Sequence, residues 1–266
     1  MKLFVFDIDQ TLLPLGDTKI PQEEMDALQA LLDHGHAIAL ASGRPPCSLV
    51  NHLSPLKGKH RYFVSANGAD LYDVEGKCLS TSFLTPKDIQ HFAKYLQPGV
   101  VLYGYEGYKN MLSNLFNEWI DLERINNGIK LEDIAYYEPG KPIVGHERLS
   151  KIMFAGDPKI IMPMRFEKED YDNYEVSRSA PHFLEILKKG STKGAKVEEL
   201  RKYLGLSPDD VYCFGDQDND ISMIERFHGV AMANAIPEAK EAAEIVTLDV
   251  KEHGVSHCLK EILHVI

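Results

Sequence analysis

Two acids at alternate positions follow an apolar run near the start of the chain. In FVFDIDQTLL (4–13), Asp7 and Asp9 come directly after the apolar residues 3–6, which are typical of a buried strand. Side chains two positions apart on a strand point to the same side, where two buried carboxylates repel each other. Either this strand ends in two solvated acids, or a cation or a proton lies between them.

Three further segments carry polar groups that suit the same chemistry. ASGR (41–44) contains Ser42, GSTKG (190–194) contains Lys193, and GDQDND (215–220) contains Asp216. Carboxylates are the oxygen ligands that Mg²⁺ prefers, and Mg²⁺ commonly joins a few of them to a substrate phosphate. The hydroxyls of Thr11 and Ser42 and the ammonium of Lys193 can bind phosphate oxygens. If these segments meet, they can position a phosphoryl group and neutralise its charge.

The elements around these segments explain how they could meet. After the first strand, Pro21 opens an amphipathic helix that stops at Gly35. The strand AIALAS (37–42), a helical stretch to about residue 53, the strand YFVSA (62–66) and a hairpin around 74–76 follow. Strands that alternate with helices through short links predict a parallel sheet covered on both faces, with its ligands at the carboxyl edge.

The middle of the chain has a different character. TPKDIQHFAKYL predicts a capped helix and NEWIDLERINNGI a second one, whereas DPKIIMPMRFEKED is a helix candidate weakened by Pro163. Strands are predicted in VVLYGYEGY, KNML, SKIMFAG, YEVSRSA and HFLEILKKG. We therefore expect a separate α+β domain over 83–183.

The alternating pattern then resumes. It predicts helices in TKGAKVEELRKYLG, DISMIERF, PEAKEAAE and VSHCLKEILHVI, and strands in VYCFGD, GVAMANA and IVTLD. The predicted fold class is α/β: residues 1–82 and 184–266 form a parallel-sheet core with helices on both faces, interrupted by the α+β insert.

Composition restricts the partners of this protein. A net charge of -11 without a long Lys/Arg cluster argues against nucleic acid. No apolar run approaches the length that crosses a bilayer, so no membrane partner is expected. An acid already at Asp7 leaves no room for the apolar core of a signal peptide, and the four scattered cysteines suit a reducing compartment. We expect a cytoplasmic protein, a monomer or a weak homodimer.

The motifs DIDQTLL, ASGRP, STKGAKVEEL and FGDQDNDISMI resemble, in order and spacing, those of the haloacid dehalogenase-like phosphatases. NGA (67–69), VAMANA (230–235) and the insert resemble the Cof-type subclass with a class IIB cap. The resemblance covers 1–82 and 184–266. It implies a Rossmann-like catalytic core, an inserted α+β cap and Mg²⁺-dependent hydrolysis of small phosphate esters.

The resemblance also implies a role for each motif residue. Asp7 would be the nucleophile that forms an aspartyl-phosphate, and Asp9 would protonate the leaving group and then activate water. The phosphate-binding residues would be Thr11, Ser42, Gly43, Lys193 and Asn219. The metal site would comprise Asp7, Asp9 through its carbonyl, Asp216 and Asp220, the last of which would orient the other ligands or Lys193.

Several residues keep two interpretations. Gln10 stands where the family usually has glycine, so it either narrows the loop or reaches into the cleft. Asn67 with Gly68 is a structural turn or a substrate contact, Arg44 braces its loop or binds substrate, and Asp218 is a solvated acid or a ligand. A further set forms either cap core or a platform for a sugar: Tyr103, Tyr105, Tyr108 and Trp119.

The predicted activity is that of a phosphomonoesterase, with sugar phosphates as the first substrate class and nucleotide or coenzyme phosphates behind them. A phosphomutase of the same superfamily is one alternative. A weakly active sensor that binds a phosphorylated ligand is another, although a binder has no need of Asp9.

Overall fold

The computed structural model describes all 266 residues and divides into two compact units. The first unit comprises Met1–Ser42, Leu49–Ser80 and Thr192–Ile266, and the second comprises Gly43–Ser48 and Thr81–Ser191. The fold is a mixed α/β protein with a mainly parallel core sheet and a second, inserted sheet. None of its helices combines the length and the apolar character that spanning a bilayer requires.

The first unit is built on an eight-stranded sheet in the order β14-β13-β12-β1-β2-β3-β4-β5. Its strands are β1 (Leu3–Phe6), β2 (Ala37–Ala41), β3 (Arg61–Ser65), β4 (Asp70–Asp73), β5 (Cys78–Thr81), β12 (Val211–Gly215), β13 (His228–Ala231) and β14 (Ile245–Val246). The helices are α1 (Gln22–Asp33), α2 (Pro46–Leu53), α7 (Lys193–Leu204), α8 (Asp218–Ile224), α9 (Pro237–Ala242) and α10 (Gly254–His257). Of these, α2 begins in the Gly43–Ser48 segment of the second unit. The six strands from β14 to β3 pair in parallel, and β4 turns back antiparallel to β3.

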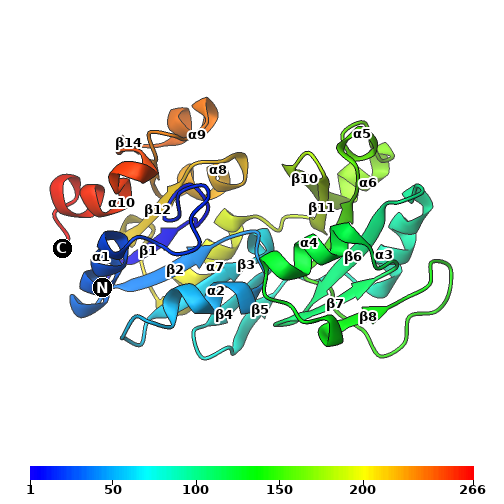
Figure 1. The fold of residues 1–266 in the computed structure, drawn as a ribbon. Helices are drawn as coiled ribbons and strands as arrows, with labels where there is room; N and C mark the ends of the chain where they lie inside the picture. Colours follow the sequence, from blue (N-terminus) through cyan, green and yellow to red (C-terminus); the bar gives the residue numbers. More distant parts are fainter. The chain divides into compact units, whose positions relative to one another are not determined.

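Strand β1 lies in the middle of this sheet, between β12 and β2 (Figure 1). All four of its residues are fully buried, which explains why the strand is an unbroken apolar run. Leu3 and Val5 share one core cluster with Val197 of α7 and Met223 of α8. Each such buried side chain contributes about 1.5–3 kcal/mol. This packing fixes the end of β1, from which the first motif leaves the sheet.

Near its C-terminus the first unit differs from the sequence-based expectation. The strand predicted in IVTLD is only two residues long, and the N–H of Thr247 makes one further bond to Ala231 of β13. The hydroxyl of Thr247 donates to the carbonyl of Gly254. The predicted closing helix is α10 followed by a wider π-helical turn over Cys258–Ile262. Helix α10 packs against α1, where the Glu24 carboxylate accepts the N–H of Ser256 at 2.7 Å.

The second unit is built on a six-stranded sheet in the order β10-β11-β9-β6-β7-β8. Its strands are β6 (Val101–Glu106), β7 (Asn110–Ser113), β8 (Ile134–Tyr136), β9 (Lys151–Ala155), β10 (Tyr174–Ala180) and β11 (Phe183–Lys188). Its helices are α3 (Pro86–Phe92), α4 (Glu118–Asn126), α5 (Pro158–Ile161) and α6 (Lys168–Asn173). All pairs are antiparallel except β7 with β8.

Three details of the second unit were not predicted. The candidate helix over 157–170 is split into α5 and α6, because Pro163 has no N–H with which to continue α5. Strand β8 was missed. Strand β11 pairs with β9 and β10, so the second unit extends to Ser191 rather than ending at 183, and it also includes the Gly43–Ser48 segment.

Candidate active site

The first motif leaves the sheet immediately after β1. The N–H of Asp7 still donates to the carbonyl of Phe214 in β12 at 3.0 Å, and its side chain is buried. The chain then turns, because the carbonyl of Ile8 accepts the N–H groups of residues 11, 12 and 13. The side chain of Asp9 is therefore exposed. The expectation that Asp7 and Asp9 point to the same side of one strand was wrong, since the strand ends before either of them.

The fourth motif follows β12 and opens helix α8. Asp220 folds back, and its Oδ2 accepts the N–H groups of Asp216 and Gln217 at 2.9 and 3.0 Å. A Cβ on Gly215 would lie 2.5 Å from the Cβ of Asp220, so only glycine fits there. The hydroxyl of Thr11 donates to Asp216 Oδ1 at 2.9 Å. This bond joins the first motif to the fourth.

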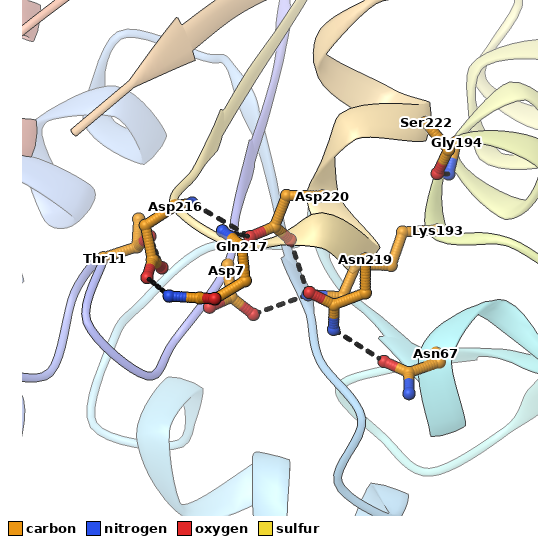
Figure 2. Close-up of polar contacts among 10 residues, drawn as sticks. All are labelled: Asp7, Thr11, Asn67, Lys193, Gly194, Asp216, Gln217, Asn219, Asp220 and Ser222. Carbon is orange, nitrogen blue, oxygen red and sulfur yellow. Dashed lines mark hydrogen bonds and ion pairs between the residues drawn. The ribbon is translucent and has the colours of Figure 1, made fainter. Parts of the chain in front are cut away.

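Lys193 brings the third motif to the same place. It is the first residue of α7, whose N-terminus is capped by Thr192. Its Nζ lies 2.7 Å from Asp7 Oδ1 and 2.6 Å from Asp220 Oδ1 (Figure 2). A Cβ on Gly194 would come within 2.0 Å of the carbonyl oxygen of Ser222, so glycine is what lets α7 approach α8 closely enough for this contact.

The site holds more negative than positive charge, and the pKa values reflect it. Burial raises the pKa of Asp7 well above its usual range, although the Lys193 ammonium acts in the opposite direction. Burial, followed by the charge of Asp220, raises the pKa of Asp216 to about 6. Burial lowers the pKa of Lys193, but the charges of Asp220 and Asp7 outweigh it and the net pKa is raised. The lysine therefore stays charged, while the carboxylates resist being charged together.

The same charges fit a divalent cation. One oxygen each from Asp7, Asp216 and Asp220 lies within 4.8 Å of the others, and all three residues are buried. Three carboxylates and one ammonium leave a formal charge of two minus, which one divalent cation would neutralise. The oxygens of Asp216 accept hydrogen bonds from the side chains of Thr11 and Gln217, whereas Asp220 accepts from the Lys193 ammonium and from two backbone N–H groups, which hold it more firmly. Asp220 is therefore suited to orient the group, and Asp7 and Asp216 are suited to bind the cation.

The second motif follows β2, the strand beside β1. Ser42 is buried, its N–H donates to Val64, and its carbonyl accepts the N–H of Asn67 at 3.0 Å. The Oδ1 of Asn67 accepts from the Nδ2 of Asn219 at 3.0 Å, so this turn contacts the fourth motif (Figure 2). A Cβ on Gly68 would lie 2.2 Å from the carbonyl oxygen of Thr192. The NGA turn therefore packs on the start of α7 and contacts Asn219.

Other candidate residues have different outcomes. Gly43 and Arg44 belong to the second unit. Asp9 was expected to bind the metal through its backbone carbonyl, so the cluster of three carboxylates does not bear on it, and its role stays a prediction. Asp218 is exposed, as expected of a solvated acid. Tyr103 and Tyr105 are buried in the core of the second unit, so they cannot form a platform for a sugar.

Two site residues were missed from the sequence. The Nε2 of Gln217 donates to Asp216 Oδ2 at 2.9 Å, and the Nδ2 of Asn234 donates to the carbonyl of Gln10 at 2.8 Å. The available signal was position alone: Gln217 lies inside the fourth motif, and Asn234 lies inside VAMANA, which marks the end of another core strand.

Comparison with known proteins identifies the family of this chain. A family model for haloacid dehalogenase-like hydrolases matches residues 4–259, and the chain belongs to that family. It is a phosphatase of the haloacid dehalogenase superfamily.

Individual relatives cover almost the whole chain. One relative is a Bacillus subtilis strain 168 protein named "Putative phosphatase YxeH". It is 29% identical, and the match covers 98% of each chain. The 5-amino-6-(5-phospho-D-ribitylamino)uracil phosphatase YwtE of the same organism is 26% identical and covers 99% of this chain and 98% of its own. The solved structure of the subclass IIB sugar phosphatase BT4131 superimposes with a TM-score of 0.79 over the full length of both chains, and at 24% identity this likeness concerns the fold.

Proposed function

We propose that this protein is a Mg²⁺-dependent phosphomonoesterase that hydrolyses small sugar or sugar-alcohol phosphates by way of a phosphorylated Asp7. The observation that supports this most strongly is the position of Asp7. Its carboxylate is buried, contacts the ammonium of Lys193 at 2.7 Å and lies within 4.8 Å of two further carboxylate oxygens. Such a group can attack phosphorus if the charge around it is neutralised.

In the first step, a carboxylate oxygen of Asp7 attacks phosphorus and the bond from phosphorus to the ester oxygen breaks. The leaving alkoxide takes a proton from the carboxylic acid of Asp9, which becomes a carboxylate. Lys193 binds phosphoryl oxygens and, through its contact with Asp7, holds the nucleophile in place. The hydroxyl of Ser42 serves as a further phosphate contact.

In the second step, the Asp9 carboxylate takes a proton from water, and the water oxygen attacks phosphorus. The bond between phosphorus and Asp7 breaks, which releases inorganic phosphate and restores both aspartates. Because the side chain of Asp9 is exposed, it can exchange protons with solvent between turnovers.

Asp7 and Asp216 would hold Mg²⁺, with the backbone carbonyl of Asp9 as a third ligand. Asp220 would fix their orientation through its bonds to Lys193 and to the N–H of Asp216. Bound Mg²⁺ would supply the positive charge that lets the carboxylates and the phosphoryl oxygens come together.

Two observations support the proposed substrate class: the name of one relative and the charges of the site. YwtE is named for a substrate in which phosphate sits on a ribityl chain, so a phosphorylated polyol or sugar is the first candidate. A single buried ammonium among acids suits a compact phosphate group better than a polyanion such as nucleic acid.

The test is phosphate release from an aryl phosphate and from a panel of sugar, sugar-alcohol, nucleotide and coenzyme phosphates, with Mg²⁺ and with EDTA. We expect Mg²⁺-dependent release that Asp7→Asn lowers at least about 10⁴-fold. Asp17→Asn, which changes an exposed acid in the same loop region, is the matched control and should keep full activity.

Release that persists in Asp7→Asn would contradict the nucleophile assignment. A sugar phosphate whose phosphate moves to another hydroxyl, seen by phosphorus NMR, would identify a phosphomutase instead. Binding of phosphorylated ligands with no turnover across the panel would favour the sensor.

A further inference from the structure

Gln10 adopts a backbone conformation that side chains other than glycine rarely take. Its φ is +68°, in the left-handed region, where a Cβ crowds the following carbonyl. The residue stands between Asp9 and Thr11, so the direction of its peptide groups sets where both of those side chains lie. Something in the surrounding structure must hold this conformation in place.

Asn234 supplies that restraint. Its Nδ2 donates to the carbonyl of Gln10 at 2.8 Å, and its Oδ1 accepts the N–H of Val250 at 2.9 Å. Only one orientation of the amide satisfies a carbonyl on one side and an N–H on the other, so the two partners together fix the orientation of the amide. The amide is a bridge between the first motif and the C-terminal part of the sheet unit.

The segment that carries Asn234 is itself anchored to the fourth motif. The N–H of Met232 donates to Gly215, and the N–H of Ile236 donates to the carbonyl of Asp216 at 3.0 Å. The N–H of Ala233 donates to Leu248. Because backbone hydrogen bonds hold the chain on both sides of Asn234, its position relative to Asp216 is fixed.

We propose that Asn234 is a positioning residue for catalysis: by holding the carbonyl of Gln10, it keeps the strained 8–13 turn in the geometry that places Asp9 and Thr11 at the phosphoryl group. The inference rests on the proposed role of Asp9. Glycine would adopt this conformation without strain, whereas this chain has glutamine and depends on the amide bridge.

The consequence concerns the peptide between residues 10 and 11. Its carbonyl is held by Asn234, and its N–H makes only a long bond, 3.3 Å, to the carbonyl of Ile8. Without the amide, the bond from the N–H of Gln10 to the carbonyl of Leu13, at 2.8 Å, is left to hold the residue, and Gln10 can relieve its strain by turning to a negative φ, which moves the peptides on both sides of it. That rotation would displace the hydroxyl of Thr11 from Asp216 and the carboxyl of Asp9 from the leaving group.

The test is a double-mutant cycle of Asn234→Ala and Gln10→Gly, assayed as kcat/KM for an aryl phosphate and for an alkyl phosphate such as glycerol phosphate. Asn234→Ala should lower kcat/KM at least about tenfold for the alkyl phosphate and less for the aryl phosphate, whose leaving group needs less help from Asp9. The double variant should have a kcat/KM within about threefold of that of Gln10→Gly alone, because glycine adopts the left-handed conformation without the bridge.

Two controls separate positioning from folding. Asn234→Asp keeps the acceptor for Val250 but places an oxygen against the carbonyl of Gln10, so it should behave like Asn234→Ala even if the alanine variant folds poorly. Asn114→Ala is the matched control, because the Oδ1 of Asn114 also accepts a backbone N–H, that of Leu102 in the second unit. This variant should leave the ratio of kcat/KM for the alkyl phosphate to kcat/KM for the aryl phosphate unchanged.

The inference would be overturned if Asn234→Ala lowered kcat/KM equally with glutamine and with glycine at position 10. It would also be overturned if the loss of kcat/KM were equal for both substrates. Either result would leave the phosphatase assignment intact. A wild-type protein that releases no phosphate from any ester would instead contradict the proposed function.

Discussion

Charged side chains are buried in both units of this protein. In the first unit, Asp7, Asp216 and Asp220 surround the single ammonium of Lys193, which leaves a formal charge of two minus. The second unit also buries two carboxylates, Glu123 and Glu185, among other polar side chains. We call this group the cap polar cluster, and its members are Tyr105, Glu123, Asn127, Lys151 and Glu185. The two groups differ in how far their charges are compensated within the fold.

The cap polar cluster is compensated from within. Lys151 Nζ lies 3.1 Å from Glu185 and donates to the carbonyl of Gly43 at 2.9 Å. Glu123 accepts from the hydroxyl of Tyr105 and, at 3.1 Å, from the amide of Asn127. The charge of Arg44, which also belongs to the second unit, acts on Glu123 as well, so two cations offset the two carboxylates. Balanced charges of this kind contribute to structure, whereas a divalent cation would stabilise the unbalanced group in the first unit, which fits the catalytic role that we propose for it.

The largest effect is expected from removing the lysine of the unbalanced group. Lys193→Met should lower phosphate release at least about 10³-fold, because the phosphoryl oxygens and Asp7 both lose their ammonium partner. Without Mg²⁺ the variant should also unfold more easily than wild type, and saturating Mg²⁺ should restore part of the difference. The measurements are steady-state kinetics and denaturant unfolding; a variant with wild-type turnover would contradict the comparison.

Removing the lysine of the balanced group should act mainly on stability. Lys151→Met leaves the Glu185 carboxylate buried without its ammonium, so the free energy of unfolding should fall by about 3–5 kcal/mol. The double variant Lys151→Met with Glu185→Gln should recover much of the loss. Turnover per folded molecule should change less than about tenfold. Equal loss of turnover in Lys151→Met and Lys193→Met would show that the two clusters share one role.

The unbalanced group should also make stability depend on pH. The pKa of Asp216 is raised to about 6 from a usual value of 3.8, so between these values the folded protein binds more protons than the unfolded chain. Without Mg²⁺, stability should therefore fall as pH rises from about 4 to 6, by up to about 3 kcal/mol. Asp216→Asn should flatten this part of the profile. Identical pH profiles of unfolding for wild type and variant would refute the electrostatic account.

The smallest effect is expected from a neutral donor in the balanced group. Tyr105→Phe removes the hydroxyl that donates to Glu123 but keeps the ring in the core of the second unit, so the free energy of unfolding should fall by about 1–2 kcal/mol. Turnover should not change. A large loss of activity without a loss of stability would move Tyr105 from the structural group to the functional one.

The sequence was sufficient for the order of elements and for the meeting of distant motifs. Apolar runs such as residues 3–6 reveal buried parallel strands, and the carboxyl ends of neighbouring strands must share one edge. That rule places Asp7 and Asp216 at the same edge, and the pairing of β1 with β12 in the structure makes them neighbours. The position of Lys193 could not be predicted from the strand pattern. A lysine between two glycines becomes informative only when it is considered together with the other motifs.

Other features depend on tertiary contacts that leave no periodic signal. The exposure of Asp9 follows from a turn that closes on the carbonyl of Ile8, and the left-handed Gln10 is held by an amide 224 residues further along the chain. The membership of Gly43–Ser48 in the second unit depends on contacts such as that of Lys151 with Gly43. Long-range hydrogen bonds of this kind follow from the fold and cannot be inferred before it is known.

The central claim is that the phosphoryl group transfers to Asp7, and acid quenching during turnover followed by peptide mass spectrometry tests it most directly. Asp9→Asn should be used beside wild type, because the loss of the base for the second step makes the phosphorylated protein accumulate with an aryl phosphate. We predict the mass of one phosphoryl group on the peptide that contains residues 3–19, located at Asp7 by fragmentation and absent from Asp7→Asn. Turnover with no phosphorylated protein at any quench time in Asp9→Asn, or a phosphoryl group on another residue, would contradict the account.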